Sequence, residues 1–351
     1  MMEHEFYIQR CLELAQLGDA SVSPNPMVGC VIVHNDKIIG EGYHQKFGEA
    51  HAEVNAVNNV LERFGNEAAN LLKNATAYVT LEPCSHFGKT PPCADLLVKH
   101  QLKKVVIGNT DPFDSVNGKG IEKLRNAGIE VISGVLEAEC KHVNRRFFTR
   151  IKEHRPYFIL KWAQTSNGFF APTEQSQKWI SGAEAKTLAH QWRTEEDAIL
   201  VGKNTVLADN PQLNTREVIG KNPIRLVIDK NLEIPSHFHV YNNAAKTIIF
   251  NEIKTDVVDN IHFVQMEDMH FYLPQKIAYQ LYLMDIQSVI IEGGANILHQ
   301  FIEANLWDEA RIFTSKTKWE NGIEAPQILG ETIEEITIGN DELKIIKRIK
   351  I

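Results

Sequence analysis

The segment TLEPCSHFGKTPPC, residues 80–93, holds two cysteines separated by eight residues, and it begins with the end of an apolar run that predicts a buried strand. About thirty residues earlier, His51-Ala52-Glu53 opens a predicted helix. One imidazole and two thiolates are a standard ligand set for a catalytic zinc ion, which keeps a fourth position for water. Cys84 and Cys93 each lie near a predicted helix start, where the helix dipole favours the thiolate. We therefore expect His51, Cys84 and Cys93 to bind zinc.

Glu53 is the candidate catalytic residue of this site. It lies two residues after His51, so its carboxylate can turn toward the open coordination position without binding the metal. That placement suits a general acid and base. Zinc-dependent base deaminases combine His-x-Glu with Pro-Cys-x-x-Cys. This chain has the first motif and the Pro83-Cys84 pair, but its cysteine spacing is Cys-x8-Cys.

Predicted strands and helices alternate in the first part of the chain, after a helix over residues 1–20. The strands are expected at 28–33, 38–43, 77–81, 105–108 and 129–132, and the helices at 51–64, 93–100 and 118–127. Alternation of this kind predicts an α/β domain in which helices cover a sheet.

The pattern changes near residues 144–156, where polar and basic residues gather and Pro156 ends any helix. A chain of 351 residues is typical of two domains, at about 100–200 residues each. We expect one domain over residues 1–145 and a second over residues 146–351. The predicted elements of the second are helices at 181–193 and 295–304 and strands at 157–162, 197–201, 224–228, 247–250 and 287–291, followed by β-rich sequence.

Two segments of the second domain point to a ligand that carries phosphate. The run SVIIEGGAN, residues 288–296, predicts a strand, a glycine pair and a helix start. Glycines let the backbone approach a phosphate, and the free amides of a helix start can bind it. The second segment, residues 201–216, predicts a strand followed by a polar, turn-forming run. A glycine pair after a strand is also common in tight turns, so both interpretations stay open.

Composition excludes several classes of protein. The 45 acidic residues outnumber the 37 basic ones, and a net charge of −8 is unlike that of a duplex-binding protein. No apolar run approaches the ~18 residues of a membrane span, and the N-terminus lacks the pattern of a secretory signal. Five cysteines are few and odd in number, so we expect a reducing cytoplasm, with Cys11, Cys30 and Cys140 as ordinary buried thiols.

Three motifs resemble those of one known family. NPMVGCV at residues 25–31, HAE at 51–53 and the segment 80–93 are similar to motifs of the bifunctional riboflavin-biosynthesis deaminase/reductase family. The long cysteine spacing separates that family from the tRNA-adenosine and cytosine deaminases, which keep two residues there. The resemblance implies an α/β fold, with a cytidine-deaminase-like three-layer domain followed by a dihydrofolate-reductase-like α/β domain.

The resemblance also implies two reactions. In the first, zinc-dependent hydrolysis releases the exocyclic amine of 2,5-diamino-6-(5-phosphoribosylamino)pyrimidin-4(3H)-one as ammonia. In the second, NADPH reduces the ribosyl side chain to the ribityl form. The resemblance further implies a small-molecule substrate and homo-oligomers formed through the reductase domain. Together with the composition, we expect a cytoplasmic enzyme with no nucleic-acid or membrane partner.

Matching positions of this sequence carry the implied contacts. In the first domain, substrate contacts are implied for Asn25, His44, His86 and Lys89. In the second domain, NADPH contacts are implied for Gln164, Trp179, Thr205, Asp209, Lys230, Gly294, Ala295 and Asn296. Substrate contacts there are implied for Lys161, Gln177, Arg193, Leu213, Arg216 and Glu292, and Lys161 is also a candidate electrostatic helper. Ser166-Asn167, Gln177 and Lys230 depart from the family pattern, which usually has a serine at the last two positions.

Two other interpretations are open at this point. A nucleic-acid base deaminase with an accessory binding domain is disfavoured by the cysteine spacing and by the acidic net charge. The other is a structural-zinc protein whose second half has lost activity. A fourth Cys or His ligand is the feature that favours it, and the motif has none. The departures at Asn167, Gln177 and Lys230 keep this interpretation open for the second half.

Overall fold

The computed structural model describes residues 3–87, 91–113, 117–173 and 180–349. The chain forms two compact units, residues 1–154 and 155–351, and each is described by itself. The sequence placed the boundary between residues 145 and 146. Helix α7 (Arg145–Glu153) lies between the two positions and belongs to the first unit. The sequence did not predict this helix, because many of its residues are charged and it buries only Phe147 and Thr149.

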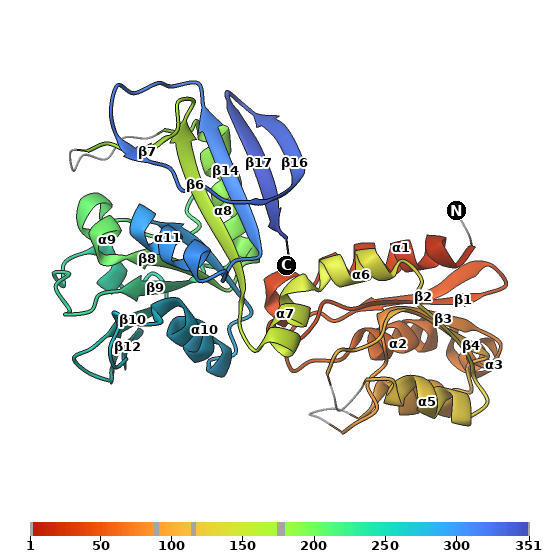
Figure 1. Ribbon diagram of the computed structural model, residues 1–351. Helices are drawn as coiled ribbons and strands as arrows, with labels where there is room; N and C mark the ends of the chain where they lie inside the picture. Colours follow the sequence, from red (N-terminus) through yellow and green to blue (C-terminus); the bar gives the residue numbers. More distant parts are fainter. Residues whose placement is uncertain (1–2, 88–90, 114–116, 174–179, 350–351) are drawn as a thin grey trace. The chain divides into compact units, whose positions relative to one another are not determined.

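A five-stranded sheet forms the middle layer of the first unit (Figure 1). Its strand order is β2-β1-β3-β4-β5, in which β1 is antiparallel to β2 and β3, and β3, β4 and β5 run parallel. The strands are β1 (Gly29–His34), β2 (Lys37–Tyr43), β3 (Thr76–Leu81), β4 (Lys104–Asn109) and β5 (Glu130–Ser133).

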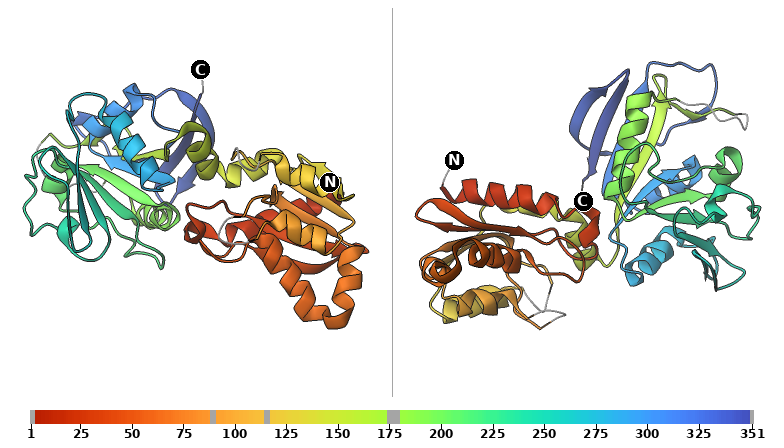
Figure 2. Two further views of the ribbon diagram at one scale, coloured as in Figure 1. Left: turned by 90° about the horizontal axis from the view of Figure 1, so that it is seen from below. Right: turned by 180° about the vertical axis from the view of Figure 1, so that it is seen from behind.

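Helices cover both faces of this sheet, as Figures 1 and 2 show: α1 (Glu3–Gln16) and α6 (Glu137–Val143) on one face, and α2 (Ala52–Phe64) on the other. On one face, Ile8 of α1 and Cys140 of α6 pack in a core with Val31 of β1. On the other face, Ile32 of β1 packs in a separate core with Val57 of α2. Successive strand residues point to opposite faces, so neighbours in β1 enter different cores. The first unit therefore has the three α/β layers that the resemblance implies. The remaining helices of this unit, besides α7, are α3 (Ala68–Lys73), α4 (Cys93–Lys99) and α5 (Lys119–Asn126).

The second unit is built on a ten-stranded sheet with the order β11-β12-β10-β9-β8-β13-β6-β14-β17-β16. The strands from β12 to β14 in this order run parallel, whereas β11, β17 and β16 pair antiparallel. The strands are β6 (Tyr157–Thr165), β8 (Ala198–Gly202), β9 (Ile224–Ile228), β10 (Thr247–Asn251), β11 (Asp256–Val258), β12 (Ile261–Gln265), β13 (Ser288–Gly293), β14 (Glu309–Ser315), β16 (Gly330–Ile338) and β17 (Asp341–Arg348), with β7 (Phe169–Ala171) and β15 (Ile323–Glu324) in a separate pair.

Helices pack on both faces of the larger sheet as well. Trp192 of α8 (Ala183–Glu195) shares a core with Ile159. The α10 (Leu273–Leu283) and α11 (Ala295–Glu303) helices pack on the opposite face. There the Phe301 and Phe158 rings meet edge to face, with their centroids 5.0 Å apart. The alternation of strands and helices predicted for the first domain is present in the first unit, whereas no α-helix separates β9, β10, β11 and β12 in the second.

The sequence prediction is wrong for residues 203–209, where a turn-forming run was expected. Lys203–Asp209 form helix α9, and Asn210, the residue that follows it, has φ +41°. Val206 is completely buried in a core with Val201 and Leu213. This tertiary contact outweighs the modest helix propensity of the Asn, Thr and Val residues.

Candidate functional site

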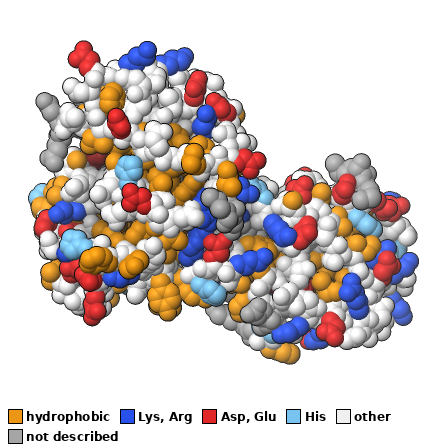
Figure 3. Space-filling view, in the orientation of Figure 1, with side chains coloured by type: hydrophobic (Ala, Val, Ile, Leu, Met, Phe, Trp, Pro, Cys, Tyr) orange, Lys and Arg blue, Asp and Glu red, His pale blue; other side chains and the backbone are white. Residues whose placement is uncertain are grey.

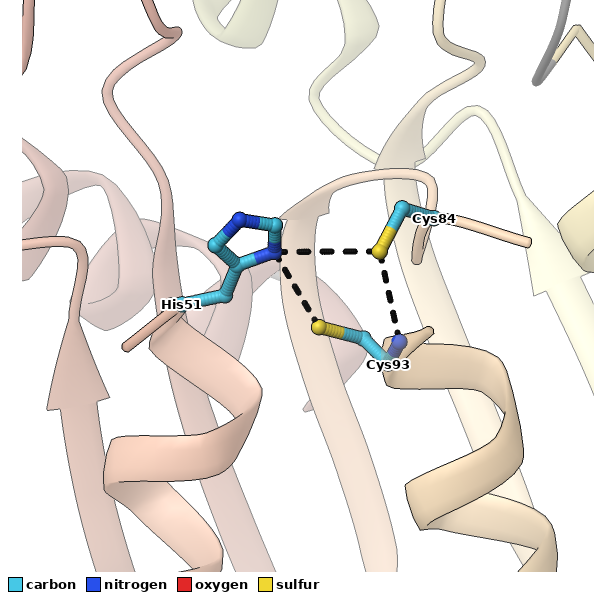
Figure 4. Close-up of side chains that lie close together, drawn as sticks. All are labelled: His51, Cys84 and Cys93. Atoms are coloured by element: carbon cyan, nitrogen blue, oxygen red, sulfur yellow. Dashed lines mark hydrogen bonds between the residues drawn. The ribbon is translucent and has the colours of Figure 1, made fainter. Parts of the chain in front are cut away.

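His51, Cys84 and Cys93 meet in the first unit (Figure 4). His51 is the residue that precedes α2, Cys84 follows β3, and Cys93 is the first residue of α4. The His51 Nδ1 atom lies 3.7 Å from the Cys84 Sγ atom and 3.3 Å from the Cys93 Sγ atom. All three ligand atoms lie within 4.8 Å of one another.

This donor set fits a zinc ion. Zinc binds thiolate at about 2.3 Å and imidazole at about 2.0 Å, so tetrahedral geometry separates the nitrogen and sulfur atoms by about 3.6 Å. The two observed N–S distances, 3.7 and 3.3 Å, bracket this value. Among the described residues, no other group of three or more His, Cys, Asp or Glu side chains could hold a metal ion, and no fourth Cys or His joins this one.

The surroundings of Cys84 favour its thiolate. The pKa of Cys84 is lowered, chiefly by the hydrogen bond from the Cys93 side chain and then by the one from His51. The backbone N–H of Cys93, at the start of α4, also donates to the Cys84 Sγ atom at 3.3 Å. Cys84 itself is in the loop after β3, and no helix starts at this residue. The amide that starts α4 reaches its sulfur nevertheless.

A pocket of about 360 Å³ opens beside this cluster, and Glu53 lies in its wall. Glu53 is the second residue of α2, and its side chain is only 3% exposed. Burial raises the pKa of Glu53, and the nearby charge of Cys84 raises it further. A carboxyl group with a raised pKa is suited to accept and return a proton.

Three of the predicted substrate contacts, Asn25, His44 and His86, line the same pocket. The Asn25 Nδ2 and His44 Nε2 atoms are 3.1 Å apart, and His44 Nδ1 lies 3.1 Å from the carbonyl oxygen of Ala50. Burial lowers the pKa of His44, so the ring is neutral, with its proton on Nδ1. Asn25 then donates to His44 Nε2, which fixes the orientation of both side chains. Lys89, also predicted, lies outside the described residues.

The pocket also contains residues that the sequence did not indicate. Phe147, Arg150 and Ile151 reach it from α7, and Asp111 and Phe113 from the loop after β4. The only sequence signal for α7 was a run of basic residues, which is also typical of a linker.

The Glu82 side chain anchors the loop after β4, although its place in the motif suggested no role. It is 3% exposed, and its carboxylate accepts hydrogen bonds from the backbone N–H groups of Asp111, Gly118, Gly120 and Ile121 at 2.9–3.3 Å. Glu82 thus holds the segment that places Asp111 and Phe113 in the pocket.

The second unit has a cleft of about 850 Å³ at the carboxyl ends of β8, β9 and β13. Ligands of open α/β sheets bind at this edge of the sheet. The cleft lining includes the following residues expected to contact NADPH or substrate: Thr205, Asp209, Lys230, Glu292, Gly294, Ala295 and Asn296.

The glycine pair in this cleft fits a phosphate group. Gly293 has φ +145°, a conformation that other residues rarely adopt. A Cβ atom on Gly294 would lie 3.3 Å from the Thr205 Oγ1 atom, so a side chain would crowd this wall of the cleft. Helix α11 begins at Ala295, and its first amides have no partner within the helix. These features fit the pyrophosphate of NADPH.

Glu292 carries a buried charge beside the cleft. Its carboxylate pairs with Arg193, whose third contact is the Asn214 carbonyl oxygen at 3.1 Å. Burial alone would raise the pKa of Glu292, but the charges of Arg193 and Lys161 lower it to about 2. Burial lowers the pKa of Lys161, and Glu292 opposes that shift.

Five predicted residues of the second unit that the structure describes do not line the cleft: Lys161, Gln164, Arg193, Leu213 and Arg216. Leu213 is 2% exposed and packs in a core, and Arg216 hydrogen-bonds to Asn214 at 3.2 Å. Gln164 accepts a hydrogen bond from Trp162 Nε1 at 2.9 Å. Gln177 and Trp179 lie outside the described residues.

Other features of the chain bear on the composition-based expectations. Cys11, Cys30 and Cys140 are buried, as the sequence predicted, and all five cysteines are free of disulfide bonds. No helix in the described part of the chain is long and apolar enough to cross a membrane.

Comparison with known proteins finds one family model within each unit. Residues 1–109 match the family model of the cytidine and deoxycytidylate deaminase zinc-binding region, and residues 156–318 match the RibD C-terminal domain. The riboflavin biosynthesis protein RibD of Aquifex aeolicus is 39% identical over 350 residues, covering 97% of this chain and 93% of that protein.

Two solved structures are similar over 99% of both chains. One is a diaminohydroxyphosphoribosylaminopyrimidine deaminase/5-amino-6-(5-phosphoribosylamino)uracil reductase from Thermotoga maritima, with a TM-score of 0.90 and 34% identity. The other is RibD of Acinetobacter baumannii, with a TM-score of 0.89 and 32% identity. The resemblance noted in the motifs thus extends along nearly the whole chain, which belongs to the RibD family of zinc- and NADPH-dependent deaminase/reductase enzymes of riboflavin biosynthesis.

Proposed function

We propose that this chain deaminates 2,5-diamino-6-(5-phosphoribosylamino)pyrimidin-4(3H)-one in its first unit and reduces the ribosyl group of the product in its second. One observation carries the proposal: the His51, Cys84 and Cys93 cluster shares a 360 Å³ pocket with the buried carboxyl group of Glu53. Family membership supplies the substrate, whose amine is removed as ammonia.

His51, Cys84 and Cys93 would hold zinc, which lowers the pKa of a bound water so that it can attack at neutral pH. Glu53 accepts a proton from the attacking water and returns it to the substrate, so that ammonia can leave. Asn25 binds the pyrimidine edge, and His44 contacts the substrate from the same pocket wall while its Nε2 atom holds the Asn25 amide in position. His86 and Lys89 act on the ribose phosphate side of the substrate.

In the second unit, NADPH supplies the hydride, so the protein has to bind and orient both reactants. Gly294, Ala295 and Asn296 bind the pyrophosphate at the start of α11, beside Thr205. The buried Arg193–Glu292 pair and Lys161 lie on the substrate side, where Lys161 supplies positive charge near the carbon that is reduced.

The remaining predicted contacts stay part of this proposal. Asp209 and Lys230 line the cofactor cleft. Gln164 and Trp179 are proposed for the cofactor, and Gln177, Leu213 and Arg216 for the substrate, on the family resemblance alone. Leu213 can contribute only through its backbone, since its side chain is buried in a core.

We further propose a homo-oligomer that forms through the second unit. Strand β16 is the edge of the ten-stranded sheet, and it exposes Ile333 and Ile336. An edge strand leaves backbone N–H and C=O groups that a strand of a second copy can pair with. A nucleic-acid partner is not expected, since acidic and basic side chains are interspersed on the face of the second unit in Figure 3. Reduced cysteine ligands suit the cytoplasm.

One incubation tests both activities. The full chain is given the diaminopyrimidine phosphate, zinc and NADPH, and ammonia release and NADPH oxidation are followed separately. We expect ammonia to appear before NADPH is consumed. Ammonia without NADPH oxidation would remove the reductase half of the proposal, and no ammonia from a zinc-loaded chain would remove the deaminase half.

A further inference from the structure

Lys203 and Lys230 are the only Lys or Arg side chains among the described residues that line the cleft of the second unit. Both lie at the carboxyl edge of the sheet, Lys203 just after β8 and Lys230 just after β9. Of the two acidic residues in the lining, Glu292 is already paired with Arg193. A phosphate that enters at the β8–β9 end therefore meets these two cations, of which Lys203 pairs with Glu233 and Lys230 with Glu252, and neither glutamate lines the cleft.

The backbone of Lys230 is held in a defined turn. The carboxylate of Asp229, which is completely buried, accepts hydrogen bonds from the N–H groups of Glu233 at 3.0 Å and Ile234 at 2.9 Å. The N–H of Glu252, just past the end of β10, donates to the carbonyl oxygen of Lys230 at 2.8 Å. Two neighbouring strand ends thus fix the position from which the Lys230 side chain extends.

The ammonium group of Lys230 is also oriented. It lies 3.2 Å from the Glu252 Oε2 atom and contacts the His270 Nε2 atom. An ammonium group only donates, so the His270 Nε2 atom is the acceptor in this contact. The other Glu252 oxygen accepts the Met269 N–H at 2.6 Å, which holds the loop that carries His270. Two described partners engage two of the three N–H donors, which leaves a third for a ligand in the cleft.

The order of strands places Lys230 at a particular distance from the glycine pair. The strands β13, β8 and β9 are neighbours in that order, and all three end at the same edge. At about 4.8 Å per strand, the end of β9 lies roughly 10 Å across the sheet from the start of α11. A dinucleotide with its pyrophosphate at Gly294 and Ala295, and its nicotinamide toward Glu292, places its adenosine ribose near β9.

We infer that Lys230, positioned by Glu252 and His270, binds the 2′-phosphate of NADPH and makes this chain select NADPH over NADH. The inference rests on the proposed function of the cleft as the cofactor site. The two cofactors differ only by this phosphate monoester, and a lysine recognises it as a point charge. Lys230 stands where the family usually has a serine, so this chain offers a full charge at that position.

Equilibrium binding to the full-length chain tests the inference without catalysis. The probes are NADP⁺ and NAD⁺, together with the fragments 2′,5′-ADP and 5′-AMP, and titration calorimetry gives each Kd. For Lys230→Ala we expect the Kd values of NADP⁺ and 2′,5′-ADP to rise about 10- to 100-fold, as for the loss of one charge-assisted hydrogen bond. Those of NAD⁺ and 5′-AMP should stay within about twofold, since they lack the 2′-phosphate.

Three further variants sharpen the test. Lys230→Arg should keep most of the preference for NADP⁺, which separates loss of charge from misfolding. His270→Ala should weaken NADP⁺ binding by a smaller factor and leave NAD⁺ unchanged, as expected of a positioning residue. Lys254→Ala is the matched control, because Lys254 is an exposed lysine that pairs with Asp256 at 2.9 Å and does not line the cleft.

Several outcomes would overturn the inference. Equal losses for NADP⁺ and NAD⁺ in Lys230→Ala would assign Lys230 to the pyrophosphate. A preference lost in Lys203→Ala but kept in Lys230→Ala would assign the 2′-phosphate to Lys203. If the wild-type chain prefers NADP⁺ and Lys230→Ala keeps that preference, the inference fails and the proposed function stands. If the wild-type chain does not bind NADP⁺ at all, both fail.

Discussion

Arg193 and Glu292 form a bidentate ion pair beside the cleft of the second unit. The Arg193 Nη2 atom lies 2.7 Å from Glu292 Oε2 and its Nε atom 3.1 Å from Oε1, and the side chains are only 11% and 13% exposed. The pair joins α8 to β13, so it links a helix to the strand that leads into the glycine pair. When one partner of a pair buried to this degree is removed, the remaining charge is unpaired and the free energy of unfolding falls.

Replacing Glu292 by Ala should therefore destabilise the second unit. Removing one partner of a buried pair costs about 3–5 kcal/mol, because the other charge is left buried and unpaired. Urea unfolding of the wild type and of Glu292→Ala measures the difference. Asp256→Ala, which breaks an exposed pair with Lys254, is the control and should leave the unfolding midpoint unchanged. An unchanged midpoint in Glu292→Ala would show that the pair adds nothing to stability.

The same pair predicts a dependence of stability on pH. The pKa of Glu292 is lowered from 4.5 to about 2 in the folded chain, against the effect of burial, by Arg193 and Lys161. The ionised group therefore stabilises the fold above pH 4.5, and this contribution is lost as the pH falls toward 2. The difference in unfolding free energy between wild type and Glu292→Gln should be constant near neutral pH and shrink below pH 4.5. A difference that grows on acidification would contradict the assignment.

Glu53→Gln should retain zinc and lose ammonia release. The amide has nearly the same shape as the carboxylate but cannot accept and return a proton, which typically costs 10²- to 10⁴-fold in rate. Elemental analysis checks the metal content, and an ammonia assay checks the rate. NADPH oxidation with the deaminated intermediate should continue unchanged, because that site lies in the other unit. Normal deamination by the zinc-loaded variant would remove Glu53 from the mechanism.

Cys84→Ala should lose zinc and deamination together. Two ligands, His51 and Cys93, then remain of the three that the structure brings within 4.8 Å. Cys140→Ala is the control, since Cys140 is a buried thiol in a core with Ile8 and Val31. Zinc is measured after gel filtration in metal-free buffer. Equal zinc content in the two variants would show that Cys84 is not a ligand.

Arg150→Ala should impair deamination through substrate binding. Arg150 is the only Lys or Arg among the described residues of the first-unit pocket, and the proposed substrate carries a phosphate. Loss of this charge should raise KM about 10- to 100-fold and change kcat little. Lys152→Ala is the matched control on α7, because Lys152 lies over the Phe148 ring at 5.4 Å and not in the pocket wall. A fall in kcat at unchanged KM would contradict a role in binding.

The two halves of the candidate site were not equally predictable. His51, Glu53, Cys84 and Cys93 come from short motifs whose spacing itself implies the chemistry. The reductase contacts rest on isolated residues in long segments, and only some of them reach the cleft. Leu213 is an example: the resemblance implied a substrate contact at this position, and the structure packs its side chain in a core.

The helices that were missed have a common cause. Helix α9 is fixed by the burial of Val206 against residues of β8, and α7 shows too little apolar periodicity to stand out among its basic residues. In both, tertiary contacts decide a conformation that local propensity leaves undecided.

By itself the sequence determined the grouping of His51, Cys84 and Cys93 with Glu53 nearby, the alternation of strands and helices in the first unit, and the family, because these depend on residue type and short-range spacing. Only the tertiary structure brought Arg150 of α7 into the deaminase pocket and joined Lys230, Glu252 and His270 at the cofactor cleft. Such contacts join segments that lie far apart in the chain, and their geometry is set by how the sheet orders its strands.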